Sequence, residues 1–118
     1  MTSDIIGAAI DNHRYLGPGL PESVYEECMA VELAERDLEV KRQMELPVHY
    51  KGRKLNAGYR IDLLVDDQVI IELNSVQKIE PHKAQLLTYL KLADKRVGLL
   101  LNFNVPVMKQ GICRLVNG

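Results

Sequence analysis

The pattern of apolar and polar residues along the first half of the chain changes from a helical period to a strand period. Apolar residues recur at helical spacing over residues 3–15, where Ser3 is expected to cap the helix, and again from about 22 to 36. Residues 40–50 and 55–65 alternate and are rich in β-branched residues. They predict two strands, separated by a turn around residues 51–53.

The second half of the chain continues with strands and one further helix. Residues 69–73 form a short apolar run typical of a strand that is covered on both faces. Pro81 is expected to open a helix, residues 96–103 return as a buried strand, and residues 112–116 form a final short strand. This order predicts an α/β (α+β) fold, in which a mixed sheet with a three-strand meander is flanked by helices.

Length and composition indicate one small domain over residues 1–118, since the chain shows no linker, repeat or low-complexity tract. No apolar run reaches the roughly 18 residues of a membrane span, and the N-terminus lacks the features of a signal peptide. We therefore expect a cytoplasmic protein with no membrane partner. Cys28 and Cys113 lie far apart without metal-ligand spacing, so they are expected to be buried, reduced thiols.

The net charge of −1 conceals two oppositely charged segments. Residues 20–40 hold seven acids against one base, and residues 41–60 hold six bases against one acid. The basic segment is a candidate for binding a phosphate backbone, and the alternative is a solvated strand face with lysines that block edge pairing. Its nucleic-acid candidates are Lys41, Arg42, Arg53, Lys54 and Arg60.

An acid inside a buried strand is the first sign of chemistry. Glu72 lies in Val-Ile-Ile-Glu-Leu, where an unpaired carboxylate would be costly. If residues 66–68 form a three-residue loop, Val65 faces Val69 and Asp62 faces Glu72 across the hairpin. Two acids placed directly opposite repel each other, so this register favours a cation between them. Mg²⁺ or Mn²⁺, which prefer carboxylate oxygens, are the natural candidates.

Two alternatives remain open from spacing alone. A two-residue loop would place Asp62 and Glu72 on opposite faces, or one acid would pair with Arg60 or a lysine. Glu22 is a third acid of interest, and its alternative role is a favourable charge in the first turn of a helix. The three histidines show no ligand spacing and are expected in surface or capping roles. They are His13, His49 and His82.

Several ordered blocks of the chain resemble a known family. Gly19-Leu20-Pro21-Glu22-Ser23-Val24-Tyr25 is similar to the signature of the GxxExxY family, which resembles the PD-(D/E)XK nuclease superfamily with its restriction-endonuclease-like core. The similarity continues through Tyr59-Arg60-Ile61-Asp62-Leu63-Leu64, Ile71-Glu72-Leu73, Gln85-Leu86-Leu87-Thr88-Tyr89-Leu90 and Val97-Gly98-Leu99-Leu100-Leu101-Asn102-Phe103.

The resemblance implies roles for individual residues. Asp62 and Glu72 are implied to be metal ligands, and Glu22 the acid from the leading helix. Gln85 and Tyr89 resemble the Gln-x-x-x-Tyr motif of the RecB-like nucleases. Residues four apart share a helix face, so these two side chains are expected to project together, and the alternative is a core tyrosine beside a solvated glutamine.

The sequence departs from the superfamily pattern at one position. The pattern has a lysine two residues after the glutamate, and Asn74 stands there. Strand alternation places this residue on the same face as Glu72, where a lysine would orient water and stabilise charge on the phosphate. Asparagine donates hydrogen bonds but carries no charge. Lys78 or Lys83 would have to reach in as a substitute, or both are solvated surface charges.

The sequence therefore predicts a metal-dependent nuclease-like domain that cleaves phosphodiester bonds, with activity reduced or absent because of Asn74. The alternative is a non-catalytic module that retains the fold and binds nucleic acid or a protein. Because one small domain offers little groove for a duplex, we expect a homodimer or a partner protein.

Overall fold

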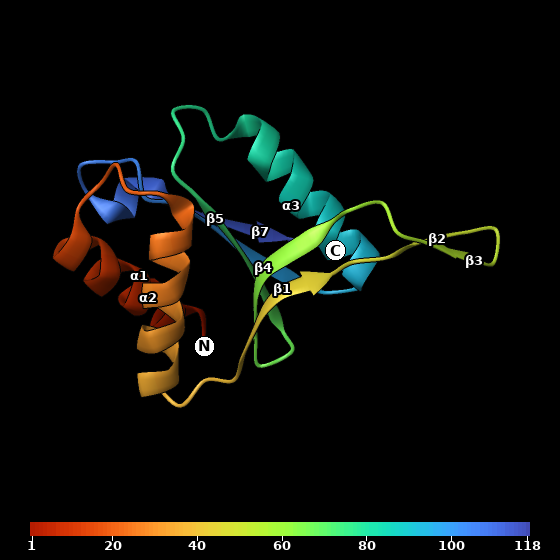
Figure 1. Ribbon diagram of the computed structural model, residues 1–118, viewed down its shortest axis with the longest axis horizontal. Helices are drawn as coiled ribbons and strands as arrows, with labels where there is room; N and C mark the ends of the chain where they lie inside the picture. Colours follow the sequence, from red (N-terminus) through yellow and green to blue (C-terminus); the bar gives the residue numbers. More distant parts are fainter.

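A five-stranded mixed sheet forms the centre of the fold, as the computed structural model of residues 1–118 shows (Figure 1). The strand order is β1-β4-β5-β6-β7, in which β5 and β6 are parallel and the other neighbours antiparallel. This confirms the predicted mixed sheet flanked by helices. The sheet strands are β1 (Val40–Glu45), β4 (Arg60–Val65), β5 (Val69–Asn74), β6 (Val97–Asn102) and β7 (Ile112–Val116).

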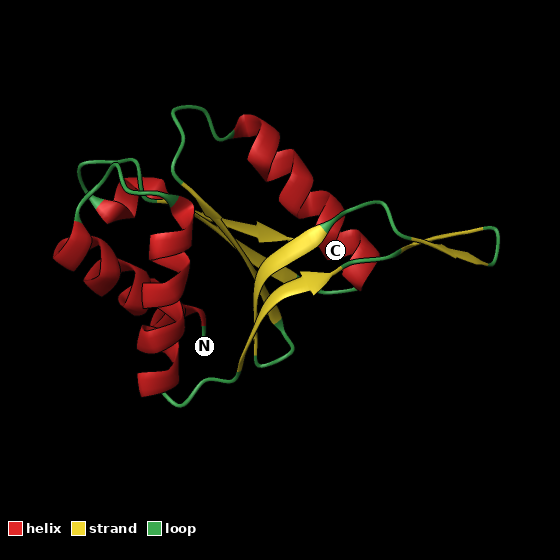
Figure 2. Ribbon diagram, in the orientation of Figure 1, coloured by secondary structure: helices red, strands yellow, loops and turns green.

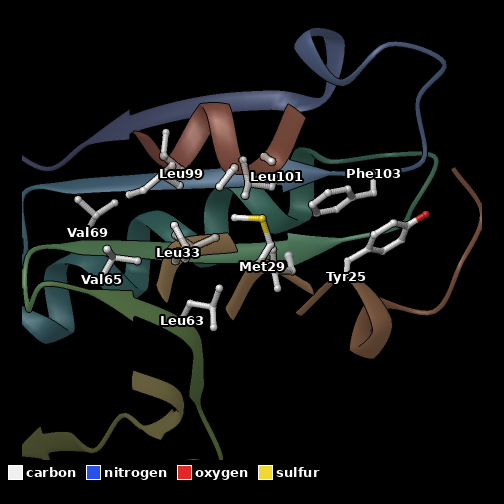
Figure 3. Packing of buried hydrophobic residues seen from close by; sticks show 14 of the residues in the cluster. Tyr25, Met29, Leu33, Leu63, Val65, Val69, Leu99, Leu101 and Phe103 are labelled. Carbon is white, nitrogen blue, oxygen red and sulfur yellow. The ribbon is translucent and has the colours of Figure 1, made fainter. Parts of the chain in front are cut away.

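Helices cover both faces of the sheet. On one face, α1 (Thr2–Leu16) and α2 (Glu22–Glu35) pack against the larger core cluster. Figure 3 shows Met29 and Leu33 of α2 pointing at the strands, with the ring of Tyr25 beside Phe103. On the other face, α3 (Glu80–Ala93) packs against a second cluster. The sheet thus separates two cores.

The turn between β4 and β5 has the predicted length. Val65 pairs with Val69, so residues 66–68 form a three-residue connection. Asp66 and Asp67 both have positive φ, 49° and 56°, and the Gln68 N–H donates to the Val65 carbonyl at 3.0 Å. Aspartate tolerates this left-handed backbone better than most residues, which explains why the sequence can turn here without glycine.

The two long strands predicted over residues 40–50 and 55–65 are each interrupted. Their inner parts, β1 and β4, pair in the central sheet, whereas β2 (Val48–Tyr50) and β3 (Arg53–Leu55) form a separate two-stranded hairpin. Pro47 lies at the interruption, and proline has no N–H to donate to a ladder. The hairpin projects from the sheet as an arm (Figure 2).

Two smaller expectations are wrong. Helix α1 begins at Thr2 with Met1 as its N-cap, and no side chain caps it, so Ser3 does not have the predicted role. His13 is buried, with 7% of its surface exposed, and its Nε2 bonds the Val105 carbonyl at 2.8 Å. Both cysteines are free thiols, as predicted, but they are half-buried and not fully buried. None of the helices is long and apolar enough to cross a membrane.

Candidate functional site

Asp62 lies where β4 and β5 stop pairing. The ladder runs from Val65 and Val69 to Leu63 and Ile71, and no further pair follows it. Beyond that point, the Leu73 N–H donates to Asp62 Oδ2 at 2.9 Å. The Asp62 carboxylate thus accepts a hydrogen bond from the backbone of β5, as a main-chain carbonyl would in a regular sheet. This bond holds the ends of β4 and β5 together. The predicted register brings Asp62 and Glu72 close to each other.

Glu72 is a buried acid with an incomplete set of partners. Its exposed fraction is 7%, and its Oε2 atom is buried with no hydrogen-bond partner. The pKa of Glu72 is raised from 4.5 to about 9, mainly by burial, and also by a hydrogen bond with Asp62 and by the negative charges of Asp62 and Glu22. At neutral pH the group is therefore protonated unless a cation binds.

No basic side chain neutralises this pair of acids. The six ion pairs of the molecule lie elsewhere, and Arg60, the proposed alternative partner, points to Glu45 at 3.9 Å. The three-residue loop and the absence of a cationic partner remove both alternatives that spacing left open. Asp62 and Glu72 remain two adjacent carboxyl groups without a positive charge.

Glu22, the third predicted acid, is the first residue of α2. Its Oε2 accepts a hydrogen bond from the Ser75 N–H at 3.0 Å, which ties the start of α2 to the segment after β5. It lies close enough to raise the pKa of Glu72 through its charge. A hollow of about 350 Å³ opens in front of this region, lined by Glu22, Ser23, Glu26, Gln43, Asp62 and Leu73.

Gln43 is a site residue that sequence reasoning missed. Its backbone has φ 52°, a left-handed conformation that is uncommon for a residue in a strand. Its Nε2 donates to Glu26 and lies 3.4 Å from Asp62 Oδ1. Strained backbone of this kind concentrates at functional sites. Nothing in the local sequence signals it, because the side chain is placed by contacts between β1, α2 and β4.

Asn74, at the position of the superfamily lysine, is also buried. Its exposed fraction is 4%, its Nδ2 lies 3.2 Å from His82 Nδ1, and its Oδ1 has no partner. His82 belongs to the first turn of α3, and sequence spacing did not indicate this contact. Lys78 is exposed and Lys83 half-buried, and neither forms an ion pair.

The two residues of the Gln-x-x-x-Tyr motif have different environments. Tyr89 is buried in the second core cluster, and its ring centroid lies 5.4 Å from that of Tyr59. Burial, followed by the charge of Glu72, raises the pKa of the Tyr89 hydroxyl, which places this group on the side of the acids. Gln85 is exposed on α3. The tyrosine is thus a core residue and the glutamine a surface residue.

The predicted basic surface divides into three parts. Arg42 is bound to α2, since it pairs with Glu26 at 2.9 Å and Glu27 at 2.7 Å. Arg53 and Lys54 lie on the arm, where both are exposed. Lys41 on β1 and Arg60 on β4 are exposed beside the main sheet. The residues predicted to track nucleic acid therefore do not form one continuous row.

The carboxyl groups of Asp62 and Glu72 have the chemistry that binds a hard divalent cation. Asp62 and Glu72 offer carboxylate oxygens, one of them buried and unpartnered, and such oxygens are the ligands that Mg²⁺ and Mn²⁺ prefer. As the side chains lie, no group of three or more His, Cys, Asp or Glu residues is placed to hold a metal ion. Glu22, whose carboxylate is occupied by Ser75, is not gathered with the other two.

A mixed sheet flanked by helices, with paired acids where two antiparallel strands separate, defines a restriction-endonuclease-like domain. Comparison with family models gives the same class. The model of the PD-(D/E)XK nuclease superfamily matches residues 1–115, and the chain belongs to that superfamily. No curated protein and no solved structure matched the chain.

Proposed function

We propose that this domain hydrolyses phosphodiester bonds of nucleic acid with the help of Mg²⁺ or Mn²⁺. The observation that supports this most directly is the buried carboxyl of Glu72. It lies beside Asp62 with an unpartnered oxygen and no basic residue within ion-pair distance. A fold that gained nothing from these charges would be more stable with neutral side chains here.

Asp62 and Glu72 are the residues that would hold the cation, and Glu22 the acid nearest to them from α2. When bound, such a cation polarises the phosphoryl group and supplies a hydroxide nucleophile near neutral pH. Asp62 is held in place for this role by the Leu73 N–H, whereas Glu22 is held by the Ser75 N–H and is not gathered with the other two acids. Tyr89, which is buried on α3, would support the site from the other core.

We also propose the finer assignment to the GxxExxY family. Gly19, Glu22 and Tyr25 each have a distinct task. Gly19 has φ 89°, which favours glycine, and Glu22 accepts from the segment after β5. The Tyr25 hydroxyl donates to the Gly17 carbonyl at 2.6 Å and accepts from the Leu20 N–H at 3.1 Å. The three residues from Gly19 to Glu22 thus span the loop before α2, and the three from Glu22 to Tyr25 span the first turn of that helix.

The second candidate function is a nucleic-acid-binding module without catalysis, and Asn74 favours it. The amide is bound to His82 and brings no charge to the phosphate. Removing an electrostatic stabiliser of this kind costs on the order of 10²–10³ in rate. A domain with that loss can still bind its substrate through the fold and the basic arm.

The decisive experiment measures metal binding and cleavage on the same samples. Isothermal titration with Mn²⁺ reports the metal site, and single- and double-stranded DNA and RNA substrates report hydrolysis with Mn²⁺ or with EDTA. We expect Mn²⁺ binding that Asp62→Asn abolishes. Glu35→Gln, which neutralises an exposed acid at the end of α2 that has no ion pair, serves as the control. Absence of Mn²⁺ binding to the wild type would refute the proposal.

Asn74→Lys separates the two candidate functions. If the asparagine alone limits the rate, the lysine variant gains about 10²–10³ in metal-dependent cleavage. Asn74→Gln, which keeps an amide of similar polarity, is the matched control and is not expected to gain. Mn²⁺ binding without cleavage in either variant would favour the binding module.

A further inference from the structure

The arm formed by β2 and β3 packs chiefly on itself. It lies at one end of the longest dimension, 46 Å, away from α1 and α2 (Figure 1). Five of its six strand residues are exposed, and Val48 is half-buried. Tyr50 and Leu55 are among the large hydrophobic residues that the protein exposes, with exposed fractions of 58% and 44%. A two-stranded hairpin alone is marginally stable in water, so an arm of this kind gains from a partner.

The charge of the arm indicates the chemistry of that partner. No acid occurs between Glu45 and Asp62, whereas Lys51, Arg53 and Lys54 lie close together and form no ion pair. All three are exposed. In a chain with a net charge of −1, this is a local concentration of positive charge that suits a polyanion.

The strand register distributes these charges over both faces of the ribbon. His49 pairs with Lys54, and Tyr50 pairs with Arg53, so each cross-strand pair carries a cation. Because successive residues point to opposite faces, one face presents Lys54 and the other Arg53. Lys51 lies at the turn, with its Nζ 5.4 Å from the Tyr50 ring centroid. A ribbon that is basic on both faces and at its tip matches a groove with phosphates on both sides.

We propose that the arm docks into the major groove of duplex DNA beside the acid site, an inference that rests on the proposed function. The major groove of B-DNA, about 12 Å wide, admits a two-stranded ribbon, whereas that of A-form RNA is too narrow for side chains to read. Single-stranded binding relies on several stacking aromatic residues, and the arm has only Tyr50.

The position of the arm relates this contact to the acid site. The chain leaves the arm and enters β4 at Arg60, two residues before Asp62. Five to six residues in strand geometry reach about 15–20 Å from the sheet to the tip at Lys51. With one base pair per 3.4 Å, the arm contacts DNA roughly five base pairs from the acids. The contact is with phosphates, so it is independent of base sequence.

The test compares a triple variant of the arm with a matched triple variant elsewhere. K51Q/R53Q/K54Q removes three charges from the arm, and K91Q/K109Q/R114Q removes three exposed, unpaired charges from α3, η1 (Met108–Gly111) and β7. Fluorescence anisotropy in EDTA measures affinity for a 30-base-pair DNA duplex, a single strand and an RNA duplex, each over a range of salt concentrations. Circular dichroism verifies that both variants fold.

We expect the arm variant to bind duplex DNA at least tenfold more weakly, and the slope of log K against log salt to fall by about 2–3. The control is expected to change affinity less than twofold. Unchanged binding by the arm variant, an equal loss in the control, or an equal loss for single strands and RNA would overturn the proposal. Because this assay contains no metal, its outcome is independent of the Mn²⁺ titration and cleavage that test the nuclease function.

Discussion

The buried carboxyl of Glu72 makes the stability of the metal-free protein depend on pH. Its pKa is about 9 in the folded protein and near 4.5 when unfolded, so folding at neutral pH takes up a proton. The protonated carboxyl contributes its full stabilisation below pH 4.5, where it is protonated in both the folded and the unfolded protein. This contribution is lost as the pH rises towards 9. At pH 7 the cost is about 3 kcal/mol, because each unit above 4.5 adds about 1.36 kcal/mol.

Glu72→Gln removes this cost and keeps the shape of the protonated side chain. We expect the variant to be about 3 kcal/mol more stable than the wild type at pH 7, and less than about 1 kcal/mol more stable at pH 5. Urea denaturation in EDTA at the two pH values measures both differences. Glu35→Gln, which neutralises an exposed acid, is the control and is expected to change stability by less than about 0.5 kcal/mol.

Two results would refute this reasoning. A gain of equal size at pH 5 and pH 7 would mean that packing, and not ionisation, limits stability at this position. A less stable variant at pH 7 would mean that Glu72 stays ionised in the folded protein and is stabilised there by a positively charged group without a metal. Mn²⁺ adds a further check, because it should stabilise the wild type and leave Glu72→Gln unchanged.

Two further variants test the packing around the site. Gly111→Ala should lower stability by at least about 2 kcal/mol in thermal denaturation, because a Cβ there would collide with the backbone carbonyl oxygen of Asn102. Gly7→Ala, with open space around it, should be neutral or stabilising, and similar losses in both would contradict this explanation. Arg42→Gln should cost about 1–2 kcal/mol in urea, because it leaves the mostly buried Glu26 without its cation. An unchanged midpoint would show that water replaces the arginine.

The helices and central strands could be predicted from the sequence, because their apolar residues recur with a regular spacing. Helical and strand spacing located all three helices and the order of the central strands. Hairpin arithmetic also placed Asp62 beside Glu72, because side-chain direction in a strand follows from register alone. The predicted strand over residues 40–50 was wrong near residue 47. The alternation of side chains continues through Pro47, but the backbone hydrogen bonds of the sheet cannot, because proline has no N–H to donate.

The contacts that shape the site depend on tertiary structure and left no local signal. Gln43 reaches Asp62 only because α2 and β4 flank its strand, and its left-handed backbone is not encoded by a glycine. The contact between Asn74 and His82 forms because α3 returns over the end of β5. Neither spacing nor composition distinguishes such residues from ordinary polar positions.

The hydrogen bonds of Tyr25 have a consequence for motion. Its hydroxyl is bonded to the loop before α2 through Gly17 and Leu20, and its ring stacks on Phe103 at 4.2 Å. One turn earlier, Glu22 bonds the segment after β5. The beginning of α2 is thereby fixed at several points, so this helix is a rigid support and not a hinge. Adjustment to a substrate must come from elements with fewer attachments, of which the arm has the fewest.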